Sequence, residues 1–177
     1  MDVVKDPDNT ITETFTHLVE KHQKTLLHIS YMYLKDRTLA EDALQETFIK
    51  AYKALPKFRG ECSEKTWLTR ILINTCRDMN KSSWFQHVNR ALQPEDLPEK
   101  AAPEEDGTQS PLSEALWHLP RKYREILVLY YYQNLTMPEI GQVLHINAST
   151  VSRRIKTACG CLEQALRKEG IPWMKSV

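Results

Sequence analysis

Apolar side chains recur every three or four residues along much of the chain, which is the spacing of an amphipathic helix. Residues 11–34, 38–55 and 64–79 each show it, and the first of these segments carries Phe15, Leu18, Leu26 and Ile29 on one side. Strict alternation of apolar and polar residues is rare, so strands are not expected. The pattern predicts an all-α protein.

Boundary signals sharpen the first three helices. Thr38 followed by Glu41 has the composition of a capping box and predicts a helix that starts at Thr38 and ends near Leu55, before Pro56. A third helix is expected to follow Ser63. The expected buried face of the second helix consists of Ala40, Leu44, Phe48, Ala51 and Leu55.

The pattern fails over residues 93–111, which hold four prolines, one glycine and six acidic residues. Such a segment cannot bury enough apolar surface to fold. We expect a flexible acidic linker over residues 82–111, joining small helical domains at residues 1–81 and 112–177. The three regions carry net charges of +1, −4 and +4, so the second domain is the basic one.

Helix signals resume with Ser110 as a cap before Pro111, and that short helix should stop before Pro120. Another helix is expected from about Arg121 to Tyr132. Next, Thr136 and Glu139 form a second predicted capping box, at the start of a helix over residues 137–144.

Asn147 is a suitable cap for a further helix that begins at Ala148. Two short helices joined by so tight a turn predict a helix-turn-helix, whose second helix enters the major groove of DNA. We expect Gly141 to lie where another helix crosses closely. His145 occupies the position where such turns favour a left-handed glycine, at mild strain.

The last helix has two contrasting faces. At about 100° per residue, its inward face should hold Val151, Ile155, Ala158, Leu162 and Leu166. The outward face and its flanks offer side chains suited to phosphates and base edges: Ser149, Ser152, Arg153, Arg154, Lys156 and Thr157. A solvated basic face on an ordinary helix bundle is the alternative.

The first domain presents two further polar faces. On the helix over 38–55, Ile49 lies among Asp42, Gln45, Glu46 and Lys53, which indicates a protein-binding surface or a solvated face. On the third helix, a stripe that could contact bases and phosphates holds Arg70, Asn74, Arg77 and Lys81. Trp67 borders this stripe and would either stack on an unpaired base or belong to the core.

Few features of the sequence support another class of protein. The start of the chain lacks a signal-peptide pattern, and the longest apolar run, Ile126 to Tyr132, is too short to span a bilayer. We therefore expect a cytoplasmic protein without membrane insertion. No motif indicates an enzyme, a cofactor or a metal site. Cys159 and Cys161 point about 200° apart on a helix and cannot share one ion by themselves.

Residues 119–166, "LPRKYREILVLYYYQNLTMPEIGQVLHINASTVSRRIKTACGCLEQAL", resemble the −35-reading domain of bacterial sigma factors, most closely the extracytoplasmic-function group. The chain departs from that pattern with Gly141 for the usual alanine, His145 for the usual turn glycine, and Gly160 within the last helix. The matching residues are Leu119-Pro120, Arg124, Ile126–Leu129, Glu139-Ile140, Thr150-Val151 and Arg153-Arg154.

Two segments of the first domain extend the resemblance. Residues 37–52 resemble the sigma segment that binds the clamp coiled coil of RNA polymerase, which implies contacts from Asp42, Gln45 and Glu46 beside Ile49. Residues 57–81 resemble the −10 reader, whose loop captures a base flipped from the non-template strand. That loop offers Arg59, Glu61 and Lys65.

The resemblance implies a transcription initiation factor that binds the polymerase core at its clamp and flap and reads −10 and −35 promoter elements. It also implies an anti-sigma factor, often membrane-anchored, and a linker threaded through the RNA-exit path. A stand-alone helix-turn-helix regulator with a ligand-sensing front domain is the stronger rival. An accessory polymerase-binding protein is a weaker one, because the basic recognition helix is intact.

Overall fold

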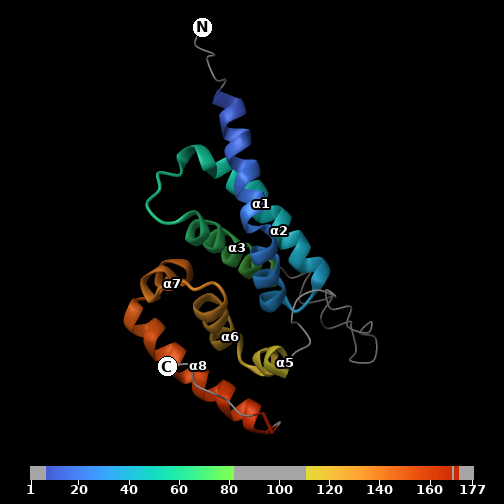
Figure 1. The fold of residues 1–177 in the computed structure, drawn as a ribbon, viewed down its shortest axis with the longest axis vertical. Coiled ribbons are helices and arrows are strands. Elements are labelled where there is room, and N and C mark those ends of the chain that lie inside the picture. Colours follow the sequence, from blue (N-terminus) through green and yellow to red (C-terminus); the bar gives the residue numbers. More distant parts are fainter. Residues whose placement is uncertain (1–6, 82–110, 169, 172–177) are drawn as a thin grey trace. The chain divides into compact units, whose positions relative to one another are not determined.

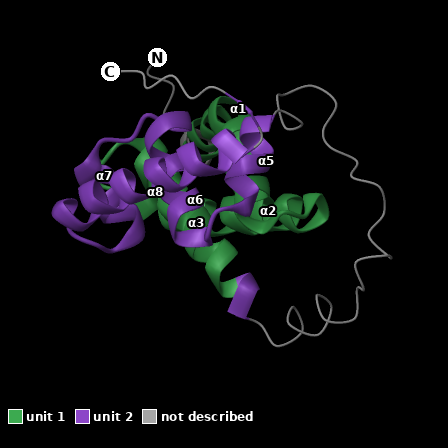
Figure 2. Cartoon of the chain, turned by 90° about the horizontal axis from the view of Figure 1, so that it is seen from below, with its two compact units in different colours: residues 1–78 green, residues 79–177 purple. Residues whose placement is uncertain are grey.

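The computed structural model describes residues 7–81, 111–168, 170 and 171, with side chains from residue 11 onward (Figure 1). The chain divides into two compact units, residues 1–78 and 79–177 (Figure 2). Every regular element of the described residues is helical, as the sequence predicted. The expected linker, apart from Pro111, lies outside the described residues, and so does the expected cap Ser110.

The first unit contains α1 (Pro7–Leu34), α2 (Arg37–Ala54), a 3-10 turn η1 (Leu55–Lys57) and α3 (Glu64–Lys81). The helices α1 and α2 lie side by side and run in opposite directions, joined by Lys35 and Asp36 (Figure 1). Leu18, Leu26 and Ile29 of α1 are fully buried, which is the amphipathic stripe that the sequence predicted.

The predicted start of α2 at Thr38 is wrong. Asp36 is the N-cap, because its backbone is extended and its carboxylate accepts a hydrogen bond from Leu39 N at 2.9 Å. Glu41 pairs instead with Arg37, with a Nε–Oε1 distance of 3.0 Å. A stronger cap two residues earlier therefore begins the helix at Arg37.

The buried face of α2 is also rotated from the prediction. Ala40 and Ala51 are buried as expected, but Ala43 and Thr47 complete the face. Leu44, Phe48 and Leu55 lie at its border and are half-exposed. Small side chains let α1 approach closely, and the Thr47 hydroxyl is satisfied by donating to the Ala43 carbonyl at 2.6 Å.

Polar side chains connect α3 to both of the other helices. Lys50 Nζ of α2 lies 3.2 Å from Thr75 Oγ1. Arg77 Nε donates to the hydroxyl of Tyr33 on α1 at 3.3 Å. These contacts fix the orientation of α3 about its own axis and therefore the direction in which its polar stripe points.

The second unit contains α5 (Pro111–His118), α6 (Arg121–Leu127), a π-helical turn η2 (Val128–Tyr132), α7 (Met137–Leu144) and α8 (Ala148–Lys168). The bounds expected for residues 121–132 are right, but the last five residues are π-helical. Gln133 N donates to Val128 O at 3.0 Å, a bond across five residues. The apolar run in this segment is buried on Ile126, Val128 and Leu129.

Arg124 is a buried cation that joins α6 to the end of α5. Its Nη1 donates to the backbone carbonyls of Trp117 and Leu119 at 3.2 and 3.3 Å. The last carbonyls of a helix have no partner within the helix. Arg124 therefore closes the C-terminal end of α5 and holds the turn that contains Leu119 and Pro120.

Among the residues that the structure describes, no helix is both long and apolar enough to cross a membrane. No group of three His, Cys, Asp or Glu side chains among these residues is placed to hold a metal ion.

Candidate nucleic-acid and polymerase interfaces

The helix-turn-helix of the second unit begins with the predicted capping box. Thr136 N donates to Glu139 Oε2 at 2.8 Å, and Glu139 N donates to Thr136 Oγ1 at 3.4 Å. His145 ends α7 in the left-handed region, with φ 57° and ψ 46°, as the sequence predicted. The chain thus reverses within three residues and enters α8 at Ala148.

Gly141 serves the turn itself and not a helix crossing, which corrects the sequence-based expectation. Ile146 N donates to the Gly141 carbonyl at 3.0 Å, which brings the two backbones together. A β-carbon at position 141 would lie 2.6 Å from the carbonyl oxygen of Ile146. Only glycine allows this approach without a shift of the backbone.

Asn147 caps α8 as predicted. Its Oδ1 accepts hydrogen bonds from Thr150 N at 2.7 Å and from Ser149 Oγ at 2.8 Å. The first turn of α8 is therefore ordered before any ligand arrives. This matters because the first turns of a recognition helix are those that meet base edges.

The faces of α8 are distributed as the sequence predicted. All five inward side chains, Val151, Ile155, Ala158, Leu162 and Leu166, are buried. Of the predicted DNA-contacting residues, Ser149, Ser152, Arg153, Lys156 and Thr157 are exposed, and Thr150 and Arg154 are half-buried. The sequence has no acidic residue between Ala148 and Leu162, so this face is uniformly basic.

The predicted polymerase-binding face of α2 is largely exposed. Asp42 and Gln45 are exposed, and Ile49 is 49% exposed despite its apolar side chain. Glu46 is half-buried and lies 3.5 Å from Lys50 Nζ in an ion pair within the helix. An exposed isoleucine bordered by acidic and amide side chains is more typical of a protein-binding surface than of a face that contacts only solvent.

Tyr52 is a residue of this surface that the sequence analysis missed. It is 45% exposed, one turn after Ile49, and its ring meets Phe15 of α1 edge to face with centroids 5.0 Å apart. The spacing of three residues from Ile49 was the signal that could have identified it. The exposed apolar part of the α2 face therefore comprises Ile49 and Tyr52.

The stripe on α3 lies where the sequence predicted. Arg70, Asn74 and Arg77 are half-buried and Lys81 is exposed. Trp67 is only 6% exposed, and it stacks on Phe58 with ring centroids 4.6 Å apart. This burial corrects the inclusion of Trp67 among the DNA-contacting residues, since its indole belongs to the core.

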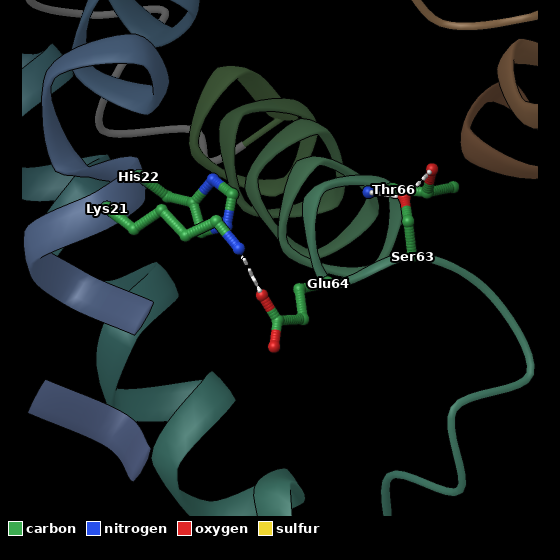
Figure 3. A network of polar contacts seen from close by, with 5 residues as sticks. All are labelled: Lys21, His22, Ser63, Glu64 and Thr66. Carbon is green, nitrogen blue, oxygen red and sulfur yellow. Dashed lines mark hydrogen bonds and ion pairs between the residues drawn. The ribbon is translucent and has the colours of Figure 1, made fainter. Parts of the chain in front are cut away.

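The loop before α3 presents the remaining candidates. Arg59 and Glu61 are exposed, and Lys65 is half-buried in the first turn of α3. Beside Lys65, Glu64 receives a 3.0 Å hydrogen bond from Lys21 Nζ of α1 (Figure 3). This hydrogen bond from Lys21 lowers the pKa of the Glu64 carboxyl, which keeps it ionised at the helix N-terminus.

Known proteins resemble this chain in both of its structural units. Residues 18–85 match the family model of sigma-70 region 2, and residues 115–164 match that of sigma-70, region 4. The chain is 30% identical over 167 residues to the RNA polymerase sigma-H factor of Pseudomonas aeruginosa, with 86% of each chain covered. The chain belongs to the sigma-70 family.

Further relatives place this sigma factor in the extracytoplasmic-function (ECF) group. It is 29% identical over 168 residues to the ECF RNA polymerase sigma factor SigW of Bacillus subtilis, covering 88% of this chain and 90% of that one. Its fold is that of the sigma factor RpoE of Bartonella quintana, solved with the anti-sigma factor NepR. The TM-score is 0.74 at 19% identity, over 88% of this chain and 98% of that one.

The exposed polar faces of α2, α3 and α8 lie inside the matched regions of this sigma factor. The α2 face and the α3 stripe lie within residues 18–85, and the basic face of α8 lies within residues 115–164. The roles of the individual side chains on those faces stay predictions.

Proposed function

We propose that this sigma factor binds the core enzyme of RNA polymerase, directs it to specific promoters through their −10 and −35 elements, and assists DNA melting. The chain performs no catalysis in this proposal, because the polymerase carries out RNA synthesis. The observation that carries it is the presence in one chain of a region 2 unit and a region 4 unit, each with its own exposed polar face.

In this proposal, the exposed faces of α2, α3 and α8 each bind a different partner. Asp42, Gln45, Glu46 and Ile49 bind the clamp of the polymerase through α2, and region 4 also meets the flap. Arg70, Asn74 and Arg77 hold the melted −10 element, with Arg59, Glu61 and Lys65 near a flipped base. The −35 duplex is read from the major groove by Ser149, Thr150, Ser152, Arg153, Arg154, Lys156 and Thr157.

The charges support this division. The three cations Arg153, Arg154 and Lys156 stand within one turn of the same helix, and cations supply most of the affinity of proteins for DNA. The α2 face combines acids with exposed apolar side chains, which suits a protein partner and repels DNA. The two faces thus favour different classes of partner.

An anti-sigma factor is the second proposed partner. RpoE of Bartonella quintana was solved in complex with one, NepR, and has the same fold as this chain. Such a protein would keep this sigma factor inactive by covering the faces that bind polymerase and DNA. Anchoring of that partner in the membrane and a cytoplasmic location of this chain are parts of the same proposal.

Transcription in vitro tests the proposal directly. Purified bacterial core polymerase, with and without this protein, would transcribe a pooled library of genomic promoter fragments, and the start sites would be sequenced. The expected result is a set of discrete starts that require the protein and share a pair of upstream elements. Fragments bound without polymerase, and no new starts, would instead favour the stand-alone regulator.

A further inference from the structure

The loop between η1 and α3 is fastened at both ends to Trp67. At the start of the loop, the ring of Phe58 stacks on the indole, with centroids 4.6 Å apart and planes inclined by 24°. At its end, Trp67 N donates to the Ser63 carbonyl at 2.9 Å. The segment 58–63 therefore closes on a single buried residue.

The same turn of α3 is also tied to α1. Ser63 Oγ accepts a hydrogen bond from Thr66 N at 3.1 Å and shares another with Thr66 Oγ1 at 2.8 Å. Glu64, the first residue of α3, pairs with Lys21 Nζ at 3.0 Å (Figure 3). Because these contacts all act on one helical turn, both ends of the loop move with it.

The middle of the loop is open, by contrast. Arg59, Gly60 and Glu61 are exposed. Gly60 has a φ of +73°, and an added β-carbon there would meet no atom within 4 Å. A few residues with a left-handed glycine thus span two fixed ends, and two of the three candidate base-capturing side chains, Arg59 and Glu61, lie on that span.

We propose that this closure, formed by Phe58, Trp67 and the Lys21–Glu64 pair, presets the loop 59–62 and thereby sets which base the sigma factor accepts at one position of the −10 element. The inference rests on the proposed function and assigns positioning roles, since these residues act on the loop and not on DNA. When the loop is ordered before DNA binds, less of the free energy of binding is lost to ordering it. Extrusion of a base costs about a few kcal/mol, so a smaller cost of ordering the loop changes which base is accepted.

Four variants separate positioning from mere stability. Phe58→Leu removes the stacked ring but keeps an apolar side chain, and Phe58→Tyr restores the ring as the conservative rescue. Lys21→Ala removes the pair with Glu64, whose side chains are 53% and 41% exposed, so the fold should tolerate it. His22 Nε2, 3.7 Å from Glu64 Oε2, remains in that variant. Lys24→Ala is the matched control, because it takes the same charge from an exposed position of α1 and leaves the Lys21–Glu64 pair intact.

The experiment uses the full-length protein with core polymerase on promoters found by the start-site experiment above. Each position of the −10 element would be randomised in turn, and transcripts from the preferred base compared with those from the next best. We expect the preference at one position to fall about two- to fivefold for Lys21→Ala and about two- to tenfold for Phe58→Leu. Phe58→Tyr, Lys24→Ala and the unmodified protein should agree, and preferences in the −35 element should not change.

Three outcomes would overturn the inference. Unchanged base preference in both Phe58→Leu and Lys21→Ala, with transcription intact, would show that the loop is not preset by these contacts. Equal loss at every promoter position, with a lowered melting temperature, would show a structural role only. Absence of promoter-specific starts with the unmodified protein would refute the proposed function itself, and the inference with it.

Discussion

The carbonyl oxygen of Ile146 lies 2.6 Å from the point where a β-carbon at Gly141 would stand. That separation is too short for two non-bonded atoms, and the obstructing atom belongs to the backbone of the turn, which cannot rotate away as a side chain would. The helix-turn-helix of this sigma factor therefore depends on glycine at a position where the family resemblance leads one to expect alanine.

Gly141→Ala should destabilise the second unit by about 1–3 kcal/mol, because the turn must open to admit the methyl group. Gly160→Ala is the matched control. It lies within α8, nothing lies within 4 Å of an added β-carbon, and the change should stabilise the protein by about 0.5–1 kcal/mol. Urea unfolding of the full chain, followed by hydrogen exchange of the α7 and α8 amides, would measure both. Equal effects of the two substitutions would contradict the steric argument.

Much of this fold was predictable because its signals are local. The capping box of α7, the cap at Asn147 and the left-handed His145 each depend on a few neighbouring residues, and all three predictions were confirmed. The inward face of α8 follows from helical period alone. Local chemistry thus determines where these helices begin and which side they bury.

Two features could not be predicted in this way, because they depend on packing between segments. The true face of α2 uses Ala43 and Thr47 because α1 approaches closely there, and no local signal reports that distance. For Trp67 the sequence left both a contact with an unpaired base and a place in the core open, because its stacking partner, Phe58, lies across a loop. Tyr52 is a different case, since its spacing of three residues from Ile49 was a local signal that could have identified it.

Arg124 provides a prediction about stability. Arg124→Met should destabilise the second unit by about 2–4 kcal/mol, because the carbonyls of Trp117 and Leu119 would be left without their donor at a buried site. Arg124→Lys should rescue little, since the shorter lysine side chain does not bring its ammonium to the position from which Nη1 alone donates to both carbonyls. Lys122→Ala, which removes an exposed cation over the Tyr123 ring, should cost less than about 1 kcal/mol. Urea unfolding compares the three, and a fully stable Arg124→Lys would refute the need for a guanidinium at this site.

The four free cysteines should differ sharply in reactivity. Burial raises the pKa of Cys76 to about 12, so its thiolate fraction at pH 8 is about a thousandfold lower than that of an ordinary thiol. Cys62, Cys159 and Cys161 are half-exposed. A thiol reagent added to the native protein should therefore modify three groups quickly and Cys76 only in denaturant, as mass spectrometry of peptides would show. Rapid labelling of Cys76 in the folded protein would contradict its placement in the core.

The proposed division between polymerase and DNA predicts opposite defects. Replacement of Asp42, Gln45 and Glu46 by alanine should weaken binding to core polymerase, while Arg153→Ala with Lys156→Ala should weaken binding to promoter DNA. The slope of log affinity against log salt is negative. For each cation that no longer neutralises a phosphate, its magnitude should decrease by about 0.9, because one fewer counterion is released. Lys168→Ala, an exposed cation in the last turn of α8, is the matched control and should leave that slope unchanged. Fluorescence anisotropy with labelled polymerase and labelled DNA measures both affinities, and equal loss of both in both variants would mean that the faces are wrongly assigned.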